Sequence, residues 1–109
     1  MDINTFIKDW VSVSNAYDTK AYLEKWGDKA VLDDPSVGKV FKGHSGIKEY
    51  FESYFIDYKT QTSLVHLNIL GDNEAQIEVE FTGEFPEGKL GAHFTSLLKT
   101  GRLQKQKQP

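Results

Sequence analysis

Cysteine is absent from this chain of 109 residues, which excludes disulfide bonds and thiolate chemistry. No hydrophobic run approaches the roughly 20 residues that a membrane-spanning helix needs. The first ten residues lack the basic start and apolar core of a secretory signal. An excess of positive charge is also missing, because 13 basic side chains stand against 16 acidic ones and the net charge is −3. We therefore expect a cytoplasmic protein that binds neither membranes nor nucleic acid.

Sequence patterns that hold metals or nucleotides are missing as well. The three histidines, His44, His66 and His93, show no zinc-binding spacing, and no carboxylate pair accompanies them. No glycine-rich phosphate-binding loop occurs. The sequence therefore predicts neither a metal nor a cofactor.

Aromatic side chains are what the sequence has in abundance, at 13% of its residues. One explanation is a well-filled core, since aromatic rings contribute much of the energy of core packing. The other is an aromatic-lined cavity for a flat or apolar ligand. Composition leaves both explanations open.

The length indicates a single domain over residues 1–109. The first half contains three segments with the apolar spacing of amphipathic helices. They cover residues 3–17, 19–26 and 45–58. Gly27 follows the second segment and is typical of a helix C-terminus.

From residue 60 onward the apolar period changes to two, which indicates strands. The predicted strands are two short ones at 31–32 and 39–42, then 64–70, 75–85, 90–98 and 102–108. The alternation in 75–85 is the clearest, with one polar and one apolar side. The last segment is polar and contains lysines, which suits an exposed sheet edge.

This order of elements predicts an α+β fold. Three N-terminal helices pack on a strongly curved, mostly antiparallel sheet, because each must bury its apolar side against the other. A twisted sheet wrapped around a long helix leaves a cone-shaped cavity between them.

The sequence resembles the nuclear transport factor 2-like superfamily with its cystatin-like fold, and within it the SnoaL-like polyketide cyclases and ketosteroid isomerases. The resemblance spans nearly the whole chain and depends on Trp10, the Asp34-Pro35 turn, Gly43 and Ile47. It implies one SnoaL-like domain, a small hydrophobic ligand and a homodimer that forms through the outer face of the sheet.

Asp34 occupies the position of the isomerases' general base, an aspartate that moves a proton between carbon atoms. Trp10 and Ser96 occupy the positions of the isomerases' two oxyanion donors, a tyrosine and a protonated aspartate. Both residues depart from the isomerase pattern, although an indole N–H and a hydroxyl can each donate a hydrogen bond. An alternative role for Asp34 is to cap its own turn by accepting backbone N–H groups.

A set of apolar and aromatic residues is predicted to line the cavity, although each also suits a plain core position. The set consists of Trp26, Phe41, Tyr54, Phe81, Phe94 and Leu98. His66 is a further candidate, either as an acid–base group of the cavity or as an ordinary surface residue.

Two hypotheses of function follow. The first is cofactor-independent proton transfer on a carbonyl compound by an isomerase, cyclase or dehydratase, with Asp34 as the base. The second is a non-catalytic ligand carrier or dimerisation module of the same fold.

Overall fold

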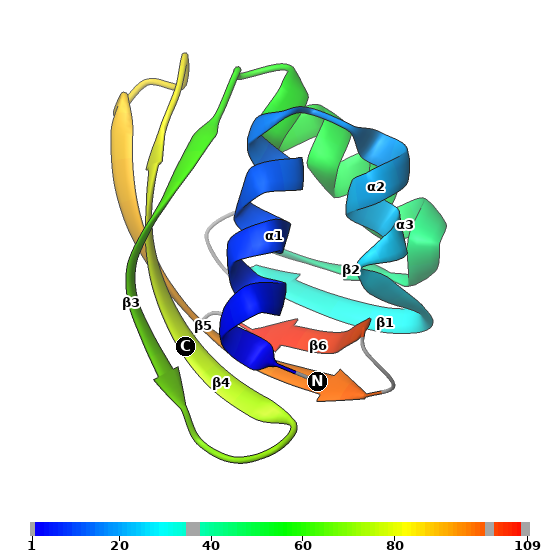
Figure 1. The fold of residues 1–109 in the computed structure, drawn as a ribbon. Coiled ribbons are helices and arrows are strands. Elements are labelled where there is room, and N and C mark those ends of the chain that lie inside the picture. The colour runs from blue at the N-terminus through cyan, green and yellow to red at the C-terminus, as the bar shows by residue number, and fades with distance from the viewer. Residues whose placement is uncertain (1, 35–37, 100–101, 108–109) are drawn as a thin grey trace.

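The computed structural model describes residues 2–34, 38–99 and 102–107 and confirms the α+β fold, with the helices packed on one face of a six-stranded sheet (Figure 1). The helical elements are α1 (Ile3–Asn15), α2 (Thr19–Glu24), α3 (Gly43–Phe51) and the π-helix η2 (Glu52–Ile56). The strands are β1 (Trp26–Asp34), β2 (Lys39–Lys42), β3 (Gln61–Ile69), β4 (Glu74–Thr82), β5 (Lys89–Lys99) and β6 (Arg102–Lys107).

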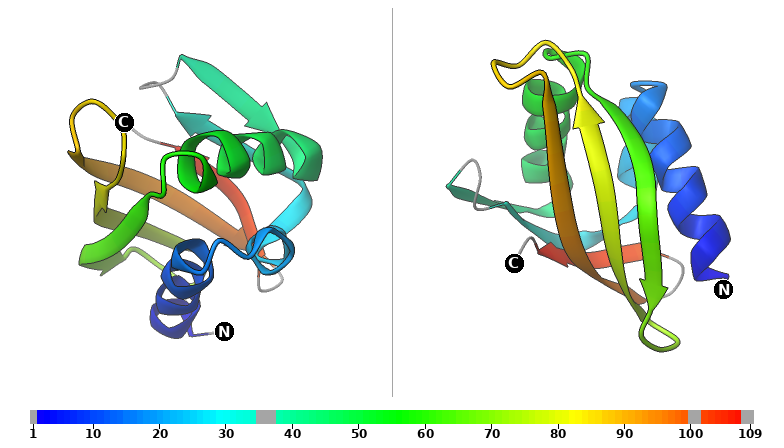
Figure 2. Two further views of the ribbon diagram at one scale, coloured as in Figure 1. Left: turned by 90° about the horizontal axis from the view of Figure 1, so that it is seen from above. Right: turned by 90° about the vertical axis from the view of Figure 1, so that its left-hand side faces the viewer.

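The sheet has the strand order β2-β1-β6-β5-β4-β3 and is antiparallel except for the parallel pair of β1 and β6. The long strands β3, β4 and β5 curve around α1, while α2 and α3 lie over β1 and β2 (Figures 1 and 2). Register shifts in β1, β3 and β5 accompany this curvature, as expected because a bulge bends and twists its strand. The predicted curved sheet is therefore present.

Helix α1 forms as its apolar spacing predicts. Asp2 caps it by accepting the backbone N–H of Asn4 at 3.0 Å. Ile3, Phe6, Ile7 and Trp10 are buried on one side of the helix, while Asn15 at its end exchanges two hydrogen bonds with the backbone of Thr62, at 2.6 and 2.9 Å. The helix is thereby fixed to β3 at its C-terminal end.

The predicted second helix is too long by two residues. Helix α2 ends at Glu24, and Trp26 and Gly27 belong to β1. Trp26 is fully buried beside Leu103 of β6, so non-local strand pairing outweighs the helical spacing of its side chain. Gly27 is not a helix end but the second residue of β1, where a Cβ atom would lie 2.6 Å from the side-chain amide of Gln104 and displace it.

Strand β3 departs from the predicted alternation at a bulge between Leu64 and His66. The bulge leaves Leu64 and Leu67 half-buried against the core, whereas Val65 is 57% exposed. It also pairs His66 with Glu78 and leaves the histidine exposed on the outer face of the sheet. By contrast, β4 follows the predicted alternation, with Ala75, Ile77, Val79 and Phe81 buried, but the strand ends at Thr82 and not at Phe85 as predicted.

Strand β6 is not the exposed edge that its polar composition suggested. It lies between β1 and β5, and its Leu103 and Gln106 are buried. The buried Gln106 amide donates a hydrogen bond of 3.4 Å to the Ser96 hydroxyl, which offsets the cost of burying a polar group. The edges of the sheet are β2 and β3 instead.

The interior position of β6 predicts a large effect of Leu103→Ala. Removing a fully buried leucine should lower the free energy of unfolding by about 3 kcal/mol, because the surrounding core cannot collapse completely into the space. Leu70, which is 47% exposed after β3, provides the control, and Leu70→Ala should change stability by no more than about 0.5 kcal/mol. Urea unfolding of both variants tests this, and equal small effects would contradict an interior β6.

Candidate functional site

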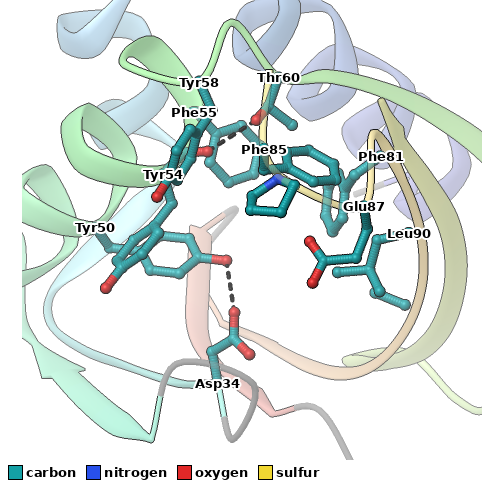
Figure 3. Close-up of a pocket in the computed structure, with 12 residues that line it drawn as sticks. Asp34, Tyr50, Tyr54, Phe55, Tyr58, Thr60, Phe81, Phe85, Glu87 and Leu90 are labelled. Atoms are coloured by element: carbon teal, nitrogen blue, oxygen red, sulfur yellow. Dashed lines mark hydrogen bonds between the residues drawn. The ribbon is translucent and has the colours of Figure 1, made fainter. Parts of the chain in front are cut away.

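A cavity of about 310 Å³ opens between the end of α3, η2 and the curved sheet (Figure 3). Six aromatic rings line it: Tyr50, Tyr54, Phe55, Tyr58, Phe81 and Phe85. The remaining lining residues are Asp34, Thr60, Pro86, Glu87, Leu90 and Ala92. This volume lies at the small end of the range for ligand pockets, and an apolar lining with a few polar groups is typical of them.

The helical wall of the cavity is positioned by the change from α-helix to π-helix. Helix α3 ends at Phe51, and the chain continues as η2 through Tyr54 and Phe55. Thr60 ends this segment by donating its backbone N–H to the Phe55 carbonyl and its hydroxyl to the Tyr54 carbonyl, both at 2.8 Å. The single wide turn therefore holds adjacent rings on the cavity wall, as π-helical turns at functional sites often do.

The opposite wall includes the turn between β4 and β5. Its Gly88 N–H donates to the Phe85 carbonyl at 2.9 Å, and the Glu84 N–H donates to the Tyr58 carbonyl at 2.6 Å. Gly83 is required for this approach, because a Cβ atom there would lie 2.9 Å from the Tyr58 carbonyl oxygen. The turn is thereby attached to the end of the helical wall, with the rings of Tyr58 and Phe85 in edge contact.

Asp34 lies in the wall of this cavity at the end of β1. Strand alternation buries it on the same side as Leu32 and leaves only 6% of the residue exposed. Its Oδ2 atom accepts a hydrogen bond from the Tyr50 hydroxyl at 3.0 Å. The turn that follows, including Pro35, lies outside the described residues, so the turn-capping alternative concerns a segment that the structure does not describe.

Tyr50 is held in its neutral form. Burial raises its pKa well above the usual value, and the negative charge of Asp34 raises it further. The phenol therefore remains a hydrogen-bond donor to the carboxylate at physiological pH and cannot itself act as a base there. Its role in the site is to orient the Asp34 carboxylate.

The predicted cavity residues divide into two groups. Tyr54 and Phe81 line the cavity. Phe41, Trp26, Phe94 and Leu98 are instead buried in the core. Phe41 lies behind the helical wall of the cavity, where its ring packs edge-on against the Tyr50 ring with the two centroids 5.0 Å apart.

Trp10 and Ser96, the expected oxyanion donors, are also core residues. The Ser96 hydroxyl accepts from Gln106, as described above. The indoles of Trp10 and Trp26 lie near the Tyr22 hydroxyl without reaching full hydrogen-bond geometry, and burial raises the pKa of Tyr22. These three polar groups are therefore enclosed together inside the core, apart from the residues that line the cavity.

His66 lies on the other side of the sheet from the cavity. It contributes to a shallow hollow on the outer face, together with Asn68, Glu78 and His93. Across the described part of the chain, no three His, Asp or Glu side chains are grouped as a metal site would need. In the same residues, no helix is long and apolar enough to cross a membrane.

Nine of the twelve described lining residues were not among the predicted cavity residues, and Tyr50, Phe85, Pro86 and Glu87 are four of them. Tyr50 belongs to the apolar stripe of the third helix, where nothing distinguishes a wall ring from a core ring. Phe85 was predicted to end the strand 75–85, but β4 ends at Thr82 and Phe85 lies in the following turn with Pro86 and Glu87, which carry no periodic signal. Only their position after the clearest strand of the sequence, at the same end of the sheet as Asp34, could have placed them near the cavity.

Solved structures with the same fold cover almost the whole chain. A proposed polyketide cyclase from Sinorhizobium meliloti matches with a TM-score of 0.86 and 18% identity, covering 96% of this chain and 94% of that chain. An epoxide hydrolase/cyclase-like enzyme with a role in pyran ring formation in salinomycin matches with a TM-score of 0.85 and 18% identity, covering 96% of this chain and 87% of that chain. A Mycobacterium tuberculosis protein in complex with estradiol-17β-hemisuccinate matches with a TM-score of 0.83 and 14% identity, covering 95% and 89%.

No protein-family model matches the chain, and no curated protein sequence matches it. Solved structures of an NTF2-like protein and of a cystatin-fold protein also match, with TM-scores of 0.80 and 0.82, which confirms the fold that the sequence predicted. At these low identities the comparison establishes the fold alone, so function is argued from the cavity.

The raised pKa of Tyr50 predicts a loss of stability in alkaline solution. Above pH 10, the usual tyrosine value, the unfolded chain releases a proton that folded Tyr50 retains, so stability falls as pH rises. Tyr50→Phe should remove up to about 1.4 kcal/mol per pH unit from this slope. Urea unfolding between pH 8 and about 11 measures the difference, and an identical alkaline slope in both proteins would contradict it.

Proposed function

We propose that this protein binds a small apolar carbonyl compound in the aromatic cavity and that Asp34 transfers a proton on it. The observation that carries the proposal is a buried carboxylate in the wall of a 310 Å³ aromatic cavity, oriented by the Tyr50 hydroxyl. A base that removes a proton next to a carbonyl needs an apolar site and a fixed position within about 3 Å of that proton. Asp34 meets the requirements for burial and orientation.

The proposed reaction needs no group from outside the chain. Asp34 takes a proton from the carbon beside the carbonyl, which leaves an enolate, and the protonated carboxyl then returns the proton to another carbon. The same first step serves an isomerisation, an aldol cyclisation or a dehydration. Because Trp10 and Ser96 lie in the core, the donor for the enolate oxygen is assigned to Tyr54, whose ring lines the cavity.

Asp34→Asn tests the catalytic step with almost no change in shape. Turnover of a panel of enones and β-keto compounds should fall at least about 100-fold, while their affinity changes little. The matched control is Asp33→Asn, since Asp33 precedes it on β1 and its side chain points to the opposite side of the strand. Steady-state kinetics together with titration calorimetry measure both quantities.

Unchanged turnover in Asp34→Asn would exclude Asp34 as the base. Binding without turnover, in the natural chain as well as in the variant, would favour the second hypothesis, a non-catalytic carrier. The Tyr50 hydrogen bond is compatible with that role, because it satisfies the buried carboxylate without any reaction.

We further propose that two chains associate through the outer face of the sheet. This face carries charges of both signs, with Lys89 Nζ 3.5 Å from Glu80 Oε2, and the exposed apolar residues Val65 and Leu97. A twofold interface places each such group opposite the same patch of the partner, so mixed charges complement one another.

Leu97→Glu should convert the proposed dimer to a monomer, because it introduces a charge at the apolar part of this face. The control is Leu70→Glu at the turn after β3, which should remain dimeric. Light scattering after size exclusion distinguishes the 12.4 kDa chain from twice that mass. A natural chain that is monomeric at high concentration would contradict the proposal.

A further inference from the structure

Among the described residues that line the cavity, the charged side chains are all of one sign. Two of the twelve lining residues, Asp34 and Glu87, are acidic, and no lysine, arginine or histidine is among them. Figure 3 shows the two carboxylate groups on different sides of the same space, with the Tyr50 hydroxyl directed at Asp34 from the helical wall. The cavity thus combines aromatic faces with two separate acidic groups.

Glu87 has no partner among the described residues. Its neighbours differ in this respect, because Glu84 pairs with Lys59 at 3.6 Å and Glu80 pairs with Lys89 at 3.5 Å. The two lysines beside this turn thus lie nearest to other carboxylates. Glu87 is left as an uncompensated negative charge at the cavity.

The turn that carries Glu87 has a defined backbone. The Gly88 N–H closes it on the Phe85 carbonyl at 2.9 Å, and Gly88 itself has φ of +69°, where glycine is favoured. Pro86 restricts the backbone immediately before Glu87. Glu87 therefore projects from an ordered support rather than from a loop without internal hydrogen bonds.

We propose that the ligand of this cavity is a cation, an apolar carbonyl compound that carries a protonated or quaternary amine. Aromatic faces attract such a cation through the ring quadrupole, and Glu87 supplies the opposite charge at the cavity mouth. The same arrangement disfavours carboxylates and phosphates, which would face two acidic groups with no basic side chain among the described lining residues. The proposal rests on the proposed function, since it names the substrate class of that same cavity.

Three probes of similar shape and different charge test the proposal. They are 2-naphthylmethylamine, which is a cation at neutral pH, the neutral 2-naphthylmethanol and the anionic 2-naphthoate. Titration calorimetry at low ionic strength should show the amine binding about tenfold more tightly than the alcohol, with the acid weakest. Added salt should reduce the advantage of the amine, because Glu87 is exposed to solvent.

Two variants separate the role of Glu87 from general surface charge. Glu87→Gln should weaken binding of the amine about threefold to fivefold and leave binding of the alcohol unchanged. Glu84→Gln is the matched control, since it removes a charge from the same turn at a side chain that does not line the cavity. It should leave the affinity of both probes unchanged.

The possible results distinguish this inference from the proposed function. If the alcohol and the amine bind equally tightly, the ligand is not selected as a cation. The same conclusion follows if Glu84→Gln lowers the affinity for the amine as much as Glu87→Gln does. Either result would leave an apolar binding cavity. If none of the three probes binds, the proposal that the cavity binds apolar compounds is contradicted, and the proposal of a cationic ligand with it.

Discussion

The hydrogen bond from the Tyr50 hydroxyl to Asp34 is the interaction on which the site depends. It joins α3 to the end of β1 across the open side of the sheet, in a place where an unpaired carboxylate would be costly to bury. The contact also affects Tyr50, because the negative charge of Asp34 raises the pKa of the phenol and helps to keep it protonated. One contact thus allows an acidic group to remain in an aromatic wall with a fixed orientation.

The π-helix η2 supports this arrangement from the side of the helices. The π-helical turn carries Tyr54 and Phe55, and both residues line the cavity. The Phe55 ring packs edge-on against the Phe81 ring of β4, with the two ring centroids 5.5 Å apart. This contact joins the helical wall of the cavity to the sheet. The cavity is therefore a consequence of local backbone geometry as well as of sheet curvature.

Periodicity predicted the parts of the fold that depend on neighbouring residues. The side of α1 that is buried, the alternation of β4 and the inward position of Asp34 all follow from it. It failed at Trp26 and at β6, where pairing between strands that are distant in sequence decides the structure, and at Val65, where a bulge reverses the alternation. The cavity was predicted less completely than the fold, because a wall ring such as Tyr50 and a core ring such as Phe41 have the same composition and spacing.

The packing of the core limits the chemistry that the cavity can perform. Trp10, Tyr22 and Trp26 are at most 1% exposed and fill the interior together with Phe51, whose ring stacks on Tyr22 at 4.0 Å. The donor positions of the isomerase pattern therefore lie behind packed rings, and a ligand in the cavity can meet only the groups of its wall. An oxyanion would have to be stabilised by a wall phenol such as Tyr54, in place of the protonated aspartate of the isomerases. A chain with this core suits substrates whose proton is more acidic than that of a simple enone, and a β-keto compound, in which two carbonyls share the charge, meets that condition.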